Sequence, residues 1–224
     1  MPEHQLEVLR DAEAAALRGA ELIAETAGEA IAARGSFALA ASGGTEPWEM
    51  YRQLAEFEVE WERVEVFQVD ERVAPDGDPD RNLTHLLESL PEPARARVRA
   101  MPVTDGDLER APARYAQQLP DTLDLIHLGL GPDGHTASLV PGDPVLEVDD
   151  RRVAITNPYH GHRRMTLTYP ELERAQRVFW LITGEEKRDS LGWLMSGDRS
   201  TPAGRVDAHE SIVIADEAAA GQIA

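Results

Sequence analysis

Short apolar runs alternate with amphipathic stretches along the chain, and glycine or charged residues follow several of the runs. Apolar residues at helical spacing over residues 6–33 predict a long opening helix. Further amphipathic stretches predict helices at 46–55, 82–90, 107–119 and 185–195, and one from Ala137 onward. Apolar or alternating runs predict strands at 37–41, 64–69, 123–128, 153–156, 164–168, 178–183 and 211–215.

This alternation of strands and helices predicts a mostly parallel sheet with helices on both faces. We therefore expect an α/β fold, a doubly wound, Rossmann-like sheet that forms a single domain over residues 1–224. The length of the chain fits one domain, and no repeat or long linker divides it. Ligands bind at the carboxyl edge of such sheets, so the residues that directly follow the strands are the candidates for chemistry.

Composition narrows the range of partners and cofactors. The formal net charge of −19 at pH 7 argues against nucleic acid or an anionic membrane surface as a partner. No run approaches the roughly 20 apolar residues of a membrane span, and no secretory signal pattern is visible, so we expect a cytoplasmic protein. Without cysteine, disulfides and thiolate metal sites are excluded. Whether genome bias or a salt-rich habitat explains the acidic, arginine-rich composition stays open.

The strongest candidate for chemistry follows the strand at 123–128. Residues 128–138 read Leu-Gly-Leu-Gly-Pro-Asp-Gly-His-Thr-Ala-Ser, a glycine-rich turn that presents backbone N–H groups and side chains at the sheet edge. Histidine titrates near neutral pH, so His135 can act as a general base there. The alternative is a Gly-Asp turn whose histidine caps the next helix.

A second turn, Ser42-Gly43-Gly44-Thr45, follows the strand at 37–41. Two adjacent glycines let the backbone approach a ligand, and the positive end of the next helix favours a phosphate or carboxylate. The alternative is an ordinary helix start with Thr45 as its N-cap.

A third turn, Asp70-Glu71-Arg72, follows the strand at 64–69 and continues to Asp80-Arg81-Asn82. Carboxylates at this place would hold a sugar hydroxyl, and the arginine would hold an oxyanion. The alternative is a solvated salt-bridge cluster that contributes little.

In this order the three turns resemble the 6-phosphogluconolactonases, hydrolases of the pentose phosphate pathway that are related to glucosamine-6-phosphate deaminases. The resemblance covers nearly the whole chain and includes residues 164–168, 183–187 and 201–206. It implies a doubly wound α/β fold and hydrolysis of 6-phospho-D-glucono-1,5-lactone to 6-phosphogluconate. The implied partner is a sugar-phosphate lactone, with no cofactor and no metal. The sequence leaves a monomer and a homodimer open.

The resemblance also implies roles for individual residues. His135 would activate water against the lactone carbonyl and return the proton to the ring oxygen, with Asp133 orienting it or binding a hydroxyl. Arg72 would stabilise the oxyanion, and Asp70 would hold a hydroxyl near the reacting carbon. The residues implied for the phosphate are Ser42, Gly43, Gly44 and Thr45 as its cradle, with Arg164 and Lys187 as its countercharge.

Lys187 is the one lysine of a chain that otherwise uses arginine. Because an ammonium and a guanidinium are not interchangeable, its place at a phosphate position of the family favours a specific role. The alternative is an ordinary helix-surface lysine beside Glu185 and Glu186.

Three other functions are alternatives to lactone hydrolysis. A deaminase of this family would carry a glutamate where this chain has Val140, and a tyrosine where it has Arg72. A sugar-phosphate sensor would normally accompany a DNA-binding segment, for which the charge of this chain is wrong. A metal-dependent hydrolase would use His160 and His162, which have no clear third ligand in the sequence.

Overall fold

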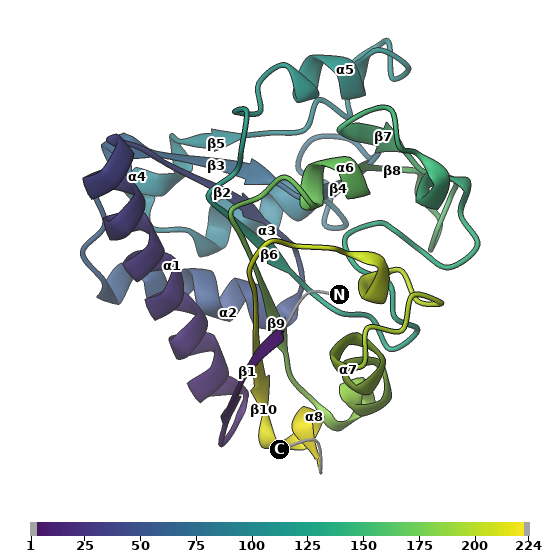
Figure 1. Ribbon diagram of the computed structural model, residues 1–224. Helices are drawn as coiled ribbons and strands as arrows, with labels where there is room; N and C mark the ends of the chain where they lie inside the picture. The colour runs from purple at the N-terminus through teal and green to yellow at the C-terminus, as the bar shows by residue number, and fades with distance from the viewer. Residues whose placement is uncertain (1–3, 222–224) are drawn as a thin grey trace.

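The computed structural model describes residues 4–221 and is built around one parallel sheet (Figure 1). Its seven strands lie in the order β1-β10-β9-β6-β2-β3-β5, and each adjacent pair is parallel. The bounds are β1 (His4–Leu9), β2 (Phe37–Ala41), β3 (Val64–Gln68), β5 (Val98–Arg99), β6 (Leu125–Leu128), β9 (Arg177–Ile182) and β10 (Ser211–Asp216).

The chain builds this sheet outward in both directions from its middle. From β2 it adds β3 and β5 on one side, and it then crosses to add β6, β9 and β10 on the other side. The strand order reverses between β2 and β6, and such a reversal opens a crevice at the carboxyl ends of the two strands. The expected doubly wound α/β fold is confirmed.

Helices cover both faces of the sheet, and each face has its own apolar core. One core contains α1 (Ala12–Arg34), α2 (Thr45–Gln53), α3 (Asn82–Ser89) and α4 (Glu92–Arg95). The other contains α5 (Ala111–Ala116), α6 (Tyr169–Leu172), α7 (Arg188–Met195) and α8 (Glu217–Ala220). Strand residues alternate between the cores, as where Ile212 and Ile214 face one core while Val213 faces the other.

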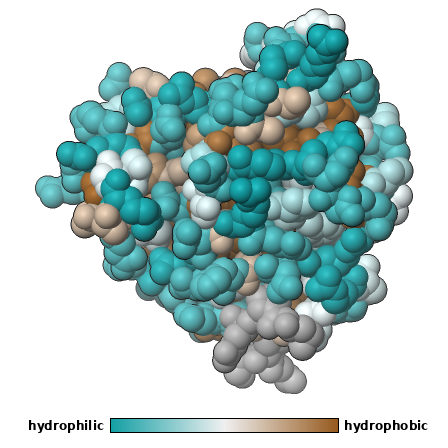
Figure 2. Space-filling model, turned by 45° about the horizontal axis from the view of Figure 1, so that its top comes forward, coloured by the Kyte–Doolittle hydropathy of each residue, from teal (hydrophilic) through white to brown (hydrophobic). Residues whose placement is uncertain are grey.

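The face of the molecule drawn in Figure 2 is mainly hydrophilic. On this face, polar side chains predominate and hydrophobic ones form small patches. Among the residues that the structure describes, no helix has the length and apolar character needed to cross a membrane.

The predicted helix over residues 6–33 is wrong for its first residues. Residues His4–Leu9 form the edge strand β1, which pairs with β10, and α1 begins only at Ala12. Leu6 and Val8 alternate with polar residues and pack against the core, so strand pairing overrides the helical spacing. The side chain of Asp11 then caps the helix by accepting a hydrogen bond from the backbone N–H of Ala14 at 2.8 Å.

A second, smaller sheet lies beside the first and was not expected. Its antiparallel strands are β4 (Asp70–Arg72), β8 (Arg164–Leu167) and β7 (Val153–Ile155). The predictions of strands at 153–156 and 164–168 are confirmed in place, but these strands do not belong to the parallel sheet. Strand β4 was predicted as a turn.

The helix predicted from Ala137 onward is absent from this described part of the chain. The backbone instead turns tightly, with the N–H of Leu139 bonded to the carbonyl of Thr136 at 2.9 Å and Ala137 at a positive φ of 51°. Side-chain and backbone hydrogen bonds of Ser138 to the neighbouring sheet compete with helix formation. Between β6 and β7 the described chain forms only one short 3₁₀ turn, Pro144–Glu147.

Candidate active site

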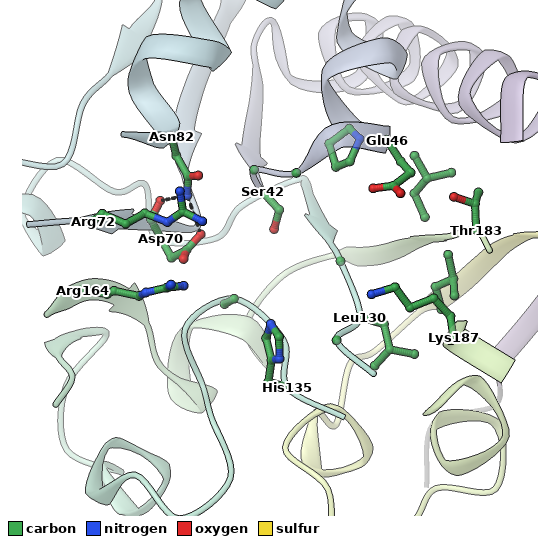
Figure 3. A pocket seen from close by; sticks show the side chains of 18 residues that line it. Ser42, Glu46, Asp70, Arg72, Asn82, Leu130, His135, Arg164, Thr183 and Lys187 are labelled. Atoms are coloured by element: carbon green, nitrogen blue, oxygen red, sulfur yellow. Dashed lines mark hydrogen bonds between the residues drawn. The ribbon is translucent and has the colours of Figure 1, made fainter. Parts of the chain in front are cut away.

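A pocket of about 180 Å³ opens at the switch point of the sheet, where β2 and β6 end (Figure 3). All three turns singled out in the sequence contribute to its wall. Its lining includes most of the expected residues, namely Ser42, Gly43, Gly44, Asp70, Arg72, His135, Arg164 and Lys187.

His135 is held against the pocket by the turn that follows β6. Its backbone N–H donates to the carboxylate of Asp133 at 3.1 Å, and its carbonyl accepts from the N–H of Gly131 at 2.8 Å. Residue 131 must be glycine for this geometry, because a Cβ there would lie 2.0 Å from Nδ1 of His135. The glycine-rich stretch therefore makes room for the imidazole.

The imidazole of His135 is paired with the carboxylate of Asp133. Nδ1 lies 2.6 Å from Oδ1 of Asp133. Partial burial raises the pKa of Asp133, but hydrogen bonds from His135 outweigh it and hold this pKa below its ordinary value. An ionised carboxylate only accepts, so Nδ1 carries the proton and Nε2 has the free lone pair of a general base. Asp133 itself contacts His135 but does not line the pocket.

The Asp-Glu-Arg triplet forms strand β4, so its successive side chains point to opposite faces of the strand. Asp70 and Arg72 face the pocket, while Glu71 is completely buried on the opposite side. Glu71 accepts hydrogen bonds of 2.8 Å from the backbone N–H groups of Asn82 and Leu83 at the start of α3, and it forms a 3.0 Å ion pair with Arg81. The solvated-cluster alternative is therefore wrong for this turn.

Asp70 is fixed by two neighbours to which the sequence analysis assigned no role. Its carboxylate accepts from the Ser138 hydroxyl at 2.6 Å and from the side-chain amide of Asn82 at 3.0 Å. Asn82 also lies against Gly43, where a Cβ would come within 2.3 Å of its Oδ1. These contacts join the three turns into one wall.

Two guanidinium groups lie together at the Asp70 end of the pocket. Arg72 and Arg164 are directly opposite each other in the antiparallel β4–β8 pair. Burial lowers the pKa of Arg164, and the charge of Arg72 lowers it further while the charge of Asp70 raises it. Two like charges side by side make this end of the pocket attractive to an anion.

The Ser42 turn lies in the middle of the pocket wall (Figure 3). Gly44, at a positive φ of 139°, is the N-cap of α2, and no side chain caps this helix within the described chain. The alternative of an N-cap by Thr45 is therefore wrong. Thr45 lies in a neighbouring cleft beside Glu13 and Glu49.

Lys187 ends the short 3₁₀ turn Glu185–Lys187, and its ammonium points into the pocket from the side opposite Arg164 (Figure 3). The two cations expected together at a phosphate thus lie at different ends. Glu46 and Thr183 line the pocket near Lys187 and, like Asn82 and Ser138, were missed. Asn82, Ser138 and Thr183 were signalled only as the end or start of quoted stretches, 80–82, 128–138 and 183–187, with no role assigned. Glu46 was not singled out.

The histidines considered for a metal lie in the turn of the β7–β8 hairpin. Nε2 of His162 is 3.0 Å from a carboxylate oxygen of Asp80, and His160 occupies the turn itself. Within residues 4–221, no three histidine, aspartate or glutamate side chains gather in a way that would hold a metal ion.

Comparison with known proteins identifies the family. The model of the glucosamine-6-phosphate isomerases/6-phosphogluconolactonase family matches residues 10–214. A 6-phosphogluconolactonase from Streptomyces coelicolor is 34% identical over 189 residues, which is 74% of this chain and 72% of the relative.

Solved structures agree with this match. The structure of 6-phosphogluconolactonase from Thermotoga maritima superposes with a TM-score of 0.84 at 26% identity, covering 95% of this chain and 99% of the other. A monomeric glucosamine-6-phosphate deaminase superposes with a TM-score of 0.85 at 19% identity, covering 96% and 98%, so it shares the fold. The chain belongs to the glucosamine-6-phosphate isomerase/6-phosphogluconolactonase family.

Proposed function

We propose that the chain is a 6-phosphogluconolactonase, which hydrolyses 6-phospho-D-glucono-1,5-lactone to 6-phosphogluconate. The observation that carries this proposal is the Asp133–His135 pair, with Nδ1 engaged at 2.6 Å and the imidazole in the wall of a pocket that also holds Arg72. A base that activates water and a cation that stabilises the oxyanion, brought together in one pocket, are the parts that ester hydrolysis by water requires. The similarity to proteins named 6-phosphogluconolactonase supports the same activity.

The reaction then needs one proton transfer in each direction. Nε2 of His135 takes a proton from water as the water oxygen bonds to the lactone carbonyl carbon. The negative charge that develops on the carbonyl oxygen is stabilised by Arg72, and Arg164, opposite it in the sheet, adds to the positive potential. When the carbon–ring oxygen bond breaks, the imidazolium returns the proton to the departing ring oxygen. Asp133 stabilises the imidazolium in between.

The remaining pocket residues bind the sugar phosphate. Asp70, whose carboxylate is held by Ser138 and Asn82, accepts a hydrogen bond from a hydroxyl near the reacting carbon. We propose that the phosphate lies over the turn of Ser42, Gly43 and Gly44, with Lys187 as its countercharge. Thr45 lines the neighbouring cleft and has no part in this assignment. Because Arg164 lies beside Arg72, we assign it to the lactone end.

The fold alone does not separate this activity from deamination, since a deaminase shares it. Val140 does bear on the choice. It is buried, at 9% exposure, and its apolar side chain offers His135 no carboxylate. A valine can neither ionise nor orient an imidazole, which favours hydrolysis.

We also propose where and with what the protein works. A phosphorylated lactone is charged and does not cross a bilayer unaided, which supports a cytoplasmic location. The net charge of −19 supports a protein without a nucleic-acid or membrane partner. Every proposed step uses a side chain of the chain itself, so the proposal includes no metal and no cofactor.

The test is a hydrolysis assay on 6-phosphogluconolactone generated in situ and corrected for spontaneous opening. Ammonia release from glucosamine 6-phosphate is measured in parallel, with and without a chelator. The proposal predicts lactone hydrolysis, no ammonia and no effect of the chelator. Ammonia release would assign the chain to the deaminases, and binding without either reaction would support a sensor.

A further inference from the structure

A closed ring of buried hydrogen bonds links Ser42, which lines the pocket, to Tyr51 and His127, which do not. The Ser42 hydroxyl donates to the backbone carbonyl of His127 at 2.8 Å. The hydroxyl of Tyr51 lies 3.1 Å from the carbonyl oxygen of Ser42 and 2.9 Å from Nδ1 of His127. Tyr51 and His127 are both 0% exposed. The ring thereby joins the ends of β2 and β6 to helix α2.

The donors in this ring can be assigned. A carbonyl oxygen only accepts, so the Tyr51 hydroxyl must donate its proton to Ser42. The Tyr51 oxygen must then accept from His127, which places the proton of that imidazole on Nδ1. Burial lowers the pKa of His127 to about 3, so the imidazole is neutral at physiological pH and has only this one N–H. The ring therefore runs from His127 through Tyr51 to the Ser42 carbonyl.

The second ring nitrogen of His127 indicates that a histidine at this position is not there to stabilise the core. Nε2 is buried and, among the residues that the structure describes, it has no hydrogen-bond partner. An unsatisfied buried acceptor is costly, and an apolar side chain against Phe179 would avoid that cost. His127 instead supplies the Nδ1–H that donates to the hydroxyl oxygen of Tyr51.

The ring determines which way the peptide between Ser42 and Gly43 faces. In a trans peptide the C=O and N–H point in opposite directions, and the described chain contains no cis peptide. Since Tyr51 holds the Ser42 carbonyl on the buried side, the N–H of Gly43 is directed to the pocket side. If the peptide flipped, a carbonyl oxygen would face the pocket, where it would repel an anion.

We propose that Tyr51 and His127 are positioning residues of the phosphate site, which fix the Ser42–Gly43 peptide with its N–H toward the phosphate. This inference rests on the proposed function, because it takes the phosphate to lie over the Ser42 turn. Neither side chain touches substrate. Their effect is on the preorganisation of the turn, and it therefore concerns binding of the phosphate more than the chemical step.

The test compares Tyr51→Phe with Tyr115→Phe. Tyr115 is a matched control, since it is also 0% exposed and its hydroxyl also bonds to backbone, at Gln68 and Arg99, away from the Ser42 turn. We expect Tyr51→Phe to raise KM for the phosphorylated lactone about tenfold and to change kcat less than threefold. Hydrolysis of unphosphorylated glucono-1,5-lactone should change less than twofold. Tyr115→Phe should leave the preference for the phosphorylated lactone unaltered.

Variants at position 127 provide a second, independent test. His127→Leu removes the donor to Tyr51, and His127→Asn places a side-chain amide N–H near the position of Nδ1. We expect His127→Leu to raise KM for the phosphorylated lactone about threefold and His127→Asn to restore it to within about 1.5-fold of wild type. If Tyr51→Phe does not fold, this pair decides the question.

Binding of 6-phosphogluconate and of inorganic phosphate, measured by calorimetry, separates this inference from the proposed function because it needs no turnover. Weaker binding of both to Tyr51→Phe would support the ring even if the wild type hydrolysed no lactone. Unchanged binding and unchanged KM in a folded Tyr51→Phe, or equal losses on both lactones, would overturn it.

Discussion

Asp133 and His135 are two residues apart in one turn, and their side chains meet through Oδ1 and Nδ1 at 2.6 Å. The turn thus supplies both the imidazole and the group that fixes its tautomer. Such pairing leaves Nε2 free to accept a proton and stabilises the imidazolium that results.

We expect Asp133→Asn to lower kcat for the phosphorylated lactone by roughly 10²-fold with a small change in KM, because the amide keeps the shape but not the charge. Steady-state kinetics on the purified variant measures this. A kcat equal to that of the wild type would show that the carboxylate has no part in the reaction.

Gly131→Ala tests whether the turn must leave space for the imidazole. The new Cβ would lie 2.0 Å from Nδ1 of His135, so the ring must move. We expect kcat to fall at least about tenfold, because small displacements of a catalytic group are costly. Gly28→Ala is the control, since a Cβ there would meet no heavy atom of the described residues within 4 Å. Equal activity in both variants would contradict the close contact.

Arg72→Met separates activity from stability. Arg72 faces Arg164 across the β4–β8 pair, and like charges in that position disfavour folding. We expect kcat to fall by about 10²–10³-fold, the usual effect of losing an oxyanion donor, while thermal stability stays equal or rises. Kinetics and a melting curve on the same sample measure both. A large loss of stability with little loss of activity would assign Arg72 a structural role instead.

His127 makes the stability of the protein depend on pH. Its pKa falls from 6.5 to about 3 on folding, so between these values the unfolded chain binds a proton that the native chain does not. Stability contributed by the neutral imidazole is therefore complete above about pH 6.5 and is lost as the pH falls toward 3. Between pH 7 and pH 5 this amounts to about 2 kcal/mol.

Denaturant unfolding at pH 7 and pH 5 measures this loss. His127→Leu has no titrating group at this position, so its free energy of unfolding should fall less between the two pH values than that of the wild type. The same fall in both proteins would mean that His127 does not titrate as its burial implies.

Much of the fold could be predicted from the sequence because buried parallel strands leave a strong local pattern. Strand β2 begins and ends at the predicted residues, Phe37–Ala41, and the order of strands and helices gives the doubly wound sheet. The edge strand β1 could not be separated from α1, since Leu6 and Leu9 fit a helical spacing while Leu6 and Val8 fit the alternation of a strand. Its pairing with β10, far along the chain, decides between them.

The site was predictable where its residues are near each other in the sequence. Asp133 and His135 share one turn, and Gly43 follows a clear strand. Asn82 and Ser138 reach Asp70 only through folding, across 12 and 68 residues, and no local pattern signals such contacts. The antiparallel β4–β8 pair, which brings Arg164 beside Arg72, depends in the same way on tertiary structure.

The most direct test of the account is the turnover of 6-phosphogluconolactone by wild type and by His135→Ala, each corrected for spontaneous opening. The measurement is accompanied by 6-phosphogluconate binding, which shows whether the pocket of the variant is intact. The account predicts a kcat lower by roughly 10²–10⁴-fold in His135→Ala, with binding still measurable. Near-normal turnover by His135→Ala would contradict the assignment of His135 as the base.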